Sequence, residues 1–264
     1  MSFSVLMSVY KGETDSNLRD CFDSLANQTL TADEVILVED GPISQSLKAT
    51  IEEYRESLNI KSVVLSTNQG LANALNEGLR QCSYELIARM DTDDIACPER
   101  FKQQVSYMNT TEVSVCSGII EEWDEDFSHL LSIRKLPTEH ADIRDFSKVR
   151  CPVSHPACMY KKIDVQSVGG YPLVYPEDHL LWIKMIQNGS KFGNLDKVLV
   201  KMRTGSDFLS RRGWRFLKGQ LETYKYMYKT DYISTYEYLK VCALMSVLRM
   251  SPKFIKSLMY KVGR

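Results

Sequence analysis

The sequence has no long hydrophobic run. Its longest apolar stretches are short, such as residues 241–248, which include Ser246. A membrane-spanning helix needs about 20 predominantly apolar residues. The N-terminus also lacks a basic segment followed by an apolar one, which is the pattern of a secretory signal. We therefore expect neither a membrane-spanning helix nor a signal peptide.

Paired cysteines and an excess of charge are also missing. The seven cysteines are an odd number, and no two stand in a Cys-x-x-Cys pair, the spacing typical of zinc and redox sites. We expect buried, reduced thiols. The formal net charge is -1, so the chain as a whole shows no bias toward nucleic acid.

Two glycine-rich phosphate loops are absent as well. No G-x-G-x-x-G follows the first expected strand, which argues against a nicotinamide-dependent dehydrogenase. Residues 10–20 contain no glycine-rich loop with arginine and lysine, which argues against a nucleotidyltransferase that makes sugar nucleotides. A non-catalytic carbohydrate-binding protein is a third alternative, and intact acidic motifs would argue against it.

Buried strands and amphipathic helices alternate along the first hundred residues. This alternation predicts an α/β fold with a Rossmann-like, mostly parallel sheet covered by helices on both faces. We expect a catalytic domain over residues 1–205 and a helical C-terminal segment over 206–264. The expected strands are 3–9, 34–38, 63–65, 86–90, 113–120 and 156–160, and the expected helices are 18–25, 47–58, 71–79 and 180–186.

The fourth expected strand runs directly into Asp91-Thr92-Asp93-Asp94. In extended chain, residues i and i+2 face the same way, so Asp91 and Asp93 can present two carboxylates to one point. Hard cations such as Mg²⁺ and Mn²⁺ prefer oxygen ligands and bridge to substrate phosphates. The alternative is a solvated acidic turn before a helix that starts near Pro98.

A second acidic segment, Glu39-Asp40-Gly41, follows the second expected strand. Parallel topology brings it to the same edge of the sheet, where ligands of open α/β sheets bind. A carboxylate there can accept hydrogen bonds from a base N–H or from ribose hydroxyls. The alternative is an Asp-Gly turn that needs no ligand.

Five segments, in order, resemble the motifs of the inverting glycosyltransferase family 2, which has the GT-A fold. Glu39 departs from that pattern, since aspartate is usual there. The segments are MSVYKG at 7–12, VEDG at 38–41, NQGLANALNEGL at 68–79, DTDD at 91–94 and PEDHLLW at 176–182.

The resemblance implies a role for each matching residue. Asp178 would be the general base, with Glu177 as the less favoured candidate. Asp93 and Asp91 would hold Mn²⁺, or Mg²⁺ in its place. His155 and Trp182 would contact the acceptor, although a structural role for His155 stays open. Donor-binding residues would be Ser8, Val9, Tyr10, Glu39, Asp40, Asn68, Gly70, Asn73, Arg89, Asp91 and Arg203.

Two departures from family patterns are informative. Many relatives carry an Arg-x-His segment whose histidine serves the metal, whereas residues 201–205 read KMRTG and leave the third ligand open. Polymer-forming relatives carry Q-x-x-R-W, which SRRGW at 210–214 does not match. We therefore expect transfer of a single sugar.

The resemblance also suggests substrates and a location. The donor would be a UDP-sugar carrying galactose or glucose, although UDP-GlcNAc or dTDP-rhamnose are alternatives. The acceptor would be a polyprenyl-diphosphate-linked N-acetylhexosamine, joined β1,3 in O-antigen assembly, with no nucleic acid partner. We expect a cytoplasmic protein, peripheral at the inner membrane. The tail would contact the membrane through Lys240, Arg249, Lys253, Lys256, Lys261 and Arg264, or would instead pack on the catalytic domain or on the second subunit of a homodimer.

Overall fold

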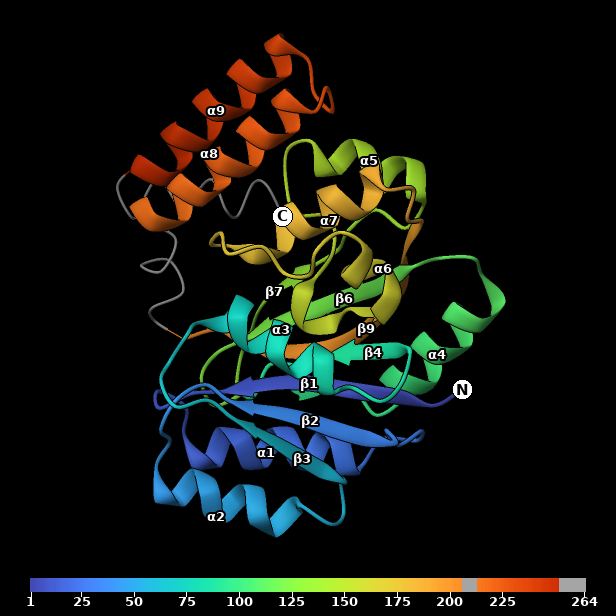
Figure 1. The fold of residues 1–264 in the computed structure, drawn as a ribbon, viewed down its shortest axis with the longest axis vertical. Coiled ribbons are helices and arrows are strands. Elements are labelled where there is room, and N and C mark those ends of the chain that lie inside the picture. Colours follow the sequence, from blue (N-terminus) through green and yellow to red (C-terminus); the bar gives the residue numbers. More distant parts are fainter. Residues whose placement is uncertain (206–212, 252–264) are drawn as a thin grey trace.

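Parallel strands and helices alternate through the first ninety residues of the computed structural model, which describes residues 1–205 and 213–251 (Figure 1). Buried apolar runs form the strands, and Thr14 and Ser44 cap two of the helices by accepting backbone N–H groups. The elements are β1 (Phe3–Val9), α1 (Asp15–Ala26), β2 (Glu34–Glu39), α2 (Gln45–Tyr54), β3 (Ile60–Val64), α3 (Leu71–Gln81) and β4 (Leu86–Arg89).

The second half of the chain adds antiparallel strands to the same sheet. A short strand, β8, runs antiparallel to both β4 and β6, and this makes the sheet mixed. The elements are β5 (Ile95–Ala96), α4 (Arg100–Thr110), β6 (Val115–Trp123), β7 (Leu130–Arg134), α5 (His140–Ser147), the 3-10 helix η1 (His155–Ala157), β8 (Met159–Lys161), α6 (Lys162–Ser167), α7 (Glu177–Gln187) and β9 (Phe192–Arg203).

The strands lie in the order β3-β2-β1-β4-β8-β6-β9-β5, and β7 pairs with β6 outside that order. The side chains of β1 alternate between two cores. Those of Val5 and Met7 pack with α1 and α4, whereas Leu6 packs with α3 and α7. The predicted α/β class, with helices on both faces, is confirmed. The strand predicted at 63–65 begins earlier, at Ile60.

Two antiparallel helices, α8 (Trp214–Lys229) and α9 (Thr235–Met250), form a hairpin beside α7 (Figure 1). Ile183 of α7 is buried with Leu217, Tyr224 and Met245 of the hairpin. The helical prediction therefore holds for this part of the tail, while the boundary at residue 205 stays a prediction. Lys253, Lys256, Lys261 and Arg264 lie outside the described residues. No helix within residues 1–205 and 213–251 is long and apolar enough to cross a bilayer.

Candidate active site

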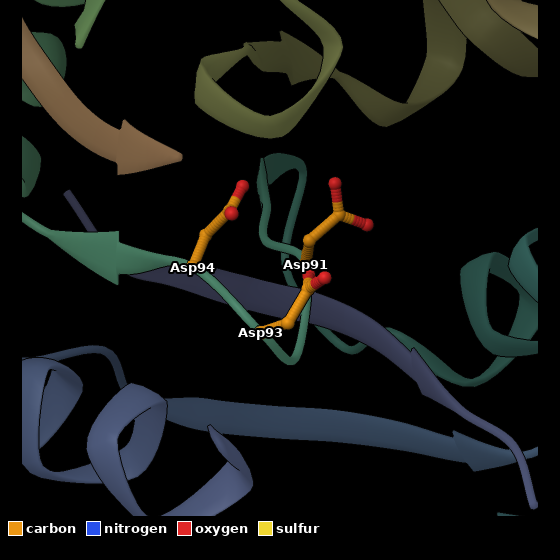
Figure 2. Close-up of side chains that lie close together, drawn as sticks. All are labelled: Asp91, Asp93 and Asp94. Atoms are coloured by element: carbon orange, nitrogen blue, oxygen red, sulfur yellow. The ribbon is translucent and has the colours of Figure 1, made fainter. Parts of the chain in front are cut away.

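Three carboxylates gather on the turn between β4 and β5 (Figure 2). Each of Asp91, Asp93 and Asp94 offers an oxygen atom, and these atoms lie within 4.8 Å of one another. The strand β4 is buried along its length, so it fixes where the turn begins. The sequence predicted the first two residues of this cluster, and the structure adds Asp94.

Burial and mutual repulsion dominate the electrostatics of this cluster. Burial, followed by the charges of Asp91 and Glu13, raises the pKa of Asp93 to about 7. Burial and the charge of Asp93 raise the pKa of Asp94 well above its usual value, and its Oδ2 atom is buried without a hydrogen-bond partner among the residues that the structure describes. Converging oxygen ligands with a net negative charge fit a hard divalent cation such as Mn²⁺ or Mg²⁺.

Arg203, at the end of β9, holds the acidic turn by hydrogen bonds. Its backbone N–H donates to Asp94 Oδ1 at 2.9 Å, and its Nε donates to the carbonyl oxygen of Asp93 at 3.0 Å. Its Nη2 also donates to Asp20 on α1 at 3.0 Å. These contacts make Arg203 a support of the turn, while its predicted contact with the donor stays a prediction.

Arg89 is the last residue of β4, directly before the same turn, and it is almost completely buried. Its Nη2 pairs with Asp91, whose side chain is 36% exposed. Within the described residues, the Nε and Nη1 atoms of Arg89 have no hydrogen-bond partner. A buried guanidinium with free N–H groups is costly unless a further acceptor arrives. The predicted contact of Arg89 with the donor stays a prediction.

The loop before α3 is held by the carboxylate of Asp40. Gln69 and Gly70 donate their backbone N–H groups to its two oxygens at 2.6 and 3.0 Å, and Asn68 donates from its side chain to the Asp40 carbonyl at 3.1 Å. Gly41, with φ of 86°, lets the two loops touch, since a Cβ there would lie 2.6 Å from the backbone nitrogen of Asn68. Both carboxylate oxygens of Asp40 therefore accept hydrogen bonds that hold the loop in shape.

The neighbouring predicted donor residues are placed differently from one another. Tyr10 is half exposed beyond β1, whereas the side chain of Val9 is completely buried. Glu39 is also buried, and no partner contacts its carboxylate among the described residues. Ser8 is partly buried, and Asn73 donates to the Gln69 carbonyl at 3.0 Å. Tyr10 and Glu39 therefore have the polar groups most available to a nucleotide.

Glu177 and Asp178 form the first turn of α7, where the helix dipole favours negative charge. Their side chains meet different neighbours. Glu177 Oε1 lies 3.6 Å from His155 Nδ1, whereas Asp178 Oδ2 accepts the thiol hydrogen of Cys151 at 3.2 Å. Burial, followed by the charge of Asp178, raises the pKa of Glu177 to about 7, and Arg89 lowers it. The charge of Asp91 also raises this pKa, so the Glu177 carboxylate lies close enough to the acidic turn to be affected by its charge.

The model for Glycosyl transferase family 2 matches residues 4–166 of this chain. These residues are more than half of the protein and contain β1, both acidic strand ends and the turn with Asp91 and Asp93. The chain belongs to glycosyl transferase family 2.

Two similar proteins are named as glycosyltransferases. The amylovoran biosynthesis glycosyltransferase AmsE of Erwinia amylovora is 42% identical over 84% of this chain and 84% of its own length. The UDP-Gal:alpha-D-GlcNAc-diphosphoundecaprenol beta-1,3-galactosyltransferase of Escherichia coli is 33% identical over 98% of this chain and 95% of its own length.

Solved structures of GT-A transferases share the fold. S. aureus TarS 1-349 in complex with UDP-GlcNAc superposes with a TM-score of 0.68 at 21% identity, covering 93% of this chain and 71% of that one. The mannosyltransferase PcManGT from Pyrobaculum calidifontis, in complex with GDP-Man and Mn²⁺, gives a TM-score of 0.66 at 14% identity. It covers 99% of this chain and 79% of that one.

The two residues predicted to contact the acceptor, Trp182 and His155, are both buried. Trp182 is fully buried, with its ring against Tyr160 and Phe192, so it packs the core and presents no surface to an acceptor. The prediction for Trp182 was wrong because the residue lies on the inner face of α7. His155 is 7% exposed, and burial lowers its pKa well below the usual value. It is a neutral ring beside Glu177.

Several residues of the site escaped the sequence reasoning. Glu13 accepts the hydroxyl hydrogen of Thr92 at 2.6 Å, which ties the loop after β1 to the acidic turn. Asn76 holds the backbone of Tyr171 with two hydrogen bonds of 2.8 Å, and this fixes the chain that leads to Glu177. Asn76 lies inside a motif that the sequence did show, and its spacing could have pointed to it. The contact of Cys151 had no such signal.

Proposed function

We propose that this transferase moves one hexose, galactose or glucose, from a UDP-sugar to a hydroxyl of a lipid-diphosphate-linked N-acetylhexosamine. The bond would be β1,3, made with inversion, in the assembly of O-antigen or another surface polysaccharide. The reaction would take place on the cytoplasmic face of the inner membrane, where the lipid-linked acceptor would be reached.

One observation carries the proposal: the cluster of three carboxylates and the buried Arg89 lie close enough to Glu177 on α7 for Asp91 and Arg89 to shift its pKa. The cluster fits a cation, and the buried Arg89 pairs with Asp91 of that cluster. Across from them, Glu177 and Asp178 offer a base. Donor activation and acceptor deprotonation need these two kinds of group at one place.

The choice of substrates is supported by one relative more than by the site. The E. coli galactosyltransferase named above is 33% identical over 98% of this chain. Its printed name specifies UDP-Gal and a GlcNAc-diphosphoundecaprenol acceptor. The alternatives are a family 2 transferase with another donor, such as UDP-GlcNAc or dTDP-rhamnose, and a carbohydrate-binding relative without catalysis.

The residues of the chain suggest how the donor is held. The half-exposed ring of Tyr10 would stack on uracil, and Glu39 would accept a hydrogen bond from the base or ribose. Arg89 would contribute positive charge beside the diphosphate, and its Nη2 would keep Asp91 in place. A Mn²⁺ or Mg²⁺ ion held by Asp91, Asp93 and Asp94 would neutralise charge on the leaving diphosphate.

The acidic pair would remove the proton from the acceptor hydroxyl as that oxygen attacks the anomeric carbon. Attack from the face opposite the nucleotide inverts the configuration, so an α-linked donor yields a β-linked product. We keep Asp178 as the base, because Cys151 and the His179 N–H orient its carboxylate. Glu177 is the second candidate, because its pKa of about 7 matches that expected of a base at neutral pH.

The test is a screen of UDP-sugars, with and without Mn²⁺, against GlcNAc- and GalNAc-diphosphate-lipid acceptors. We expect transfer from UDP-galactose or UDP-glucose, loss of transfer in EDTA and recovery when Mn²⁺ is restored. Transfer only from another sugar nucleotide would replace the donor assignment. Full activity in EDTA would remove the metal, and donor binding without transfer to any acceptor would favour the non-catalytic alternative.

A further inference from the structure

The outer face of α9 is an apolar stripe with nothing packed on it among the described residues. Its large side chains recur at helical spacing and are 43–74% exposed. The opposite face of α9 is buried against α8 and α7. The stripe, as we define it, consists of Tyr236, Leu239, Leu244, Val247 and Met250.

The charges around the stripe have one dominant sign. Lys240, next to Leu239 of the stripe, is exposed. Glu237 accepts a hydrogen bond from the backbone N–H of Ser234 at the start of α9. The exposed side of α8 carries Arg215, Lys218, Lys225 and Lys229 against the single acid Glu222. Trp214, at the first turn of α8, is 69% exposed. Apolar side chains beside lysines and exposed aromatic rings match an anionic lipid surface.

The hairpin is also tied directly to the loop that carries the acidic pair. Gly219 of α8 packs on the backbone of Tyr175, two residues before Glu177. The Tyr175 ring meets Phe216 edge-on, with a centroid distance of 5.7 Å, and Arg215 lies 5.1 Å from the centre of the same ring. The beginning of α8 and the end of α9 lie on the same side of the molecule as the carboxyl ends of β1 and β2 (Figure 1).

We propose that the stripe on α9, with the basic side of α8, seats this transferase on an anionic lipid bilayer and so presents the acidic pair to acceptors in that bilayer. This inference rests on the proposed function for its purpose, although binding to lipid can be measured without it. A stripe that contacted a second copy of the chain would need a complementary surface, whereas a bilayer accepts apolar side chains flanked by lysines directly.

The first test is flotation of the full-length protein with vesicles of phosphatidylcholine, with and without phosphatidylglycerol. We expect flotation that increases with phosphatidylglycerol and falls at least about tenfold in Leu239→Glu/Val247→Glu. The matched control is Leu131→Glu/Ile133→Glu, which changes two exposed apolar residues of β7 and should float like wild type. Wild type that stays unbound, or a stripe variant that floats equally well, would overturn the proposal.

Charge and self-association are tested separately. Lys218→Glu/Lys225→Glu should reduce the effect of phosphatidylglycerol, and an unchanged lipid preference would overturn the role of α8. Light scattering on the eluted protein should give the same mass for wild type and the stripe variant. A dimer that dissociates in the stripe variant would assign the stripe to a second copy and overturn the membrane assignment.

Activity then separates this inference from the proposed function. On a short-chain, water-soluble acceptor without vesicles, the stripe variant should turn over like wild type, whereas on the acceptor embedded in vesicles it should be at least about tenfold slower. Equal rates on the embedded acceptor would overturn the inference. If no diphosphate-linked acceptor is used at all, the proposed function fails, and flotation alone still decides whether the stripe binds lipid.

Discussion

Replacing Asp93 with asparagine is expected to stabilise the metal-free transferase at neutral pH and to remove its stabilisation by Mn²⁺. The folded protein raises the pKa of Asp93 from 3.8 to about 7, chiefly through burial and then through the charge of Asp91. An ionised Asp93 therefore costs folding free energy when no cation is present. Asparagine keeps the shape of the side chain and removes the charge.

The magnitude follows from that shift. Three pKa units at about 1.4 kcal/mol each set a ceiling of about 4 kcal/mol. The side chain is partly exposed, and solvent screening reduces the expected gain to about 1–2 kcal/mol. For a chain of this size, each kcal/mol raises Tm by about 2–4 °C. We therefore expect a Tm increase of about 2–8 °C for Asp93→Asn in EDTA at pH 7.5.

The pH dependence has a definite sign. Between pH 4 and pH 7 the folded protein holds a proton on Asp93 that the unfolded chain has released. Stability of the wild type therefore falls as pH rises through this window. The advantage of Asp93→Asn should be largest above pH 7 and should shrink toward pH 4.

The assay is thermal denaturation followed by circular dichroism, in EDTA and in Mn²⁺. A cation at 100 times its dissociation constant adds about 2.7 kcal/mol to the wild type, and the variant should lose most of this gain. Asp196→Asn is the control, because that carboxylate is 75% exposed and 3.7 Å from its lysine partner. A variant that is less stable than wild type in EDTA, or equally stabilised by Mn²⁺, would refute the reasoning.

Three further predictions concern the acidic pair and the loops around it. Asp178→Asn should keep donor binding but lower kcat by about 10²- to 10⁴-fold. The two roles would be exchanged if this variant turned over nearly normally while Glu177→Gln lost both its activity and the ionisation near pH 7 in its pH–rate profile. Asp40→Ala should lower the free energy of unfolding by about 2–4 kcal/mol and raise KM for the donor, because two backbone N–H groups lose a charged acceptor; an unchanged KM would show that the loop does not shape the donor site. Gly219→Ala should cost about 1–3 kcal/mol, since the new methyl group meets the Tyr175 carbonyl; a Tm equal to wild type would contradict the close packing.

The first half of the fold could be predicted because its signals are local. The strands β1, β2 and β4 are short buried runs that end in polar loops, and parallel topology then places those ends together. The second half could not be read in this way. β9 has the sequence FGNLDKVLVKMR, in which polar residues interrupt the apolar pattern, because its middle lies in irregular pairing with β6.

The site was predicted where one segment supplies the chemistry and missed where distant segments meet. Asp91 and Asp93 are neighbours in the chain, so their spacing indicated the cluster. Asp94 joins them through the amide of Arg203, which is 109 residues away in sequence. Trp182 belongs to the motif that contains Glu177 and Asp178, and only the helix geometry of α7 shows that its ring points into the core.

The contact between Gly219 and Tyr175 bears on how this transferase can be recombined with its relatives. A chimera that takes α8 and α9 from another protein would inherit a helix shaped for a different loop, and the new joint would lie two residues from Glu177. Residues 171–178 and the hairpin therefore form one exchangeable module, although 35 residues separate their nearest ends. Grafts that move this module intact should keep the acidic pair in register, whereas grafts cut between its two parts should fold with the pair displaced.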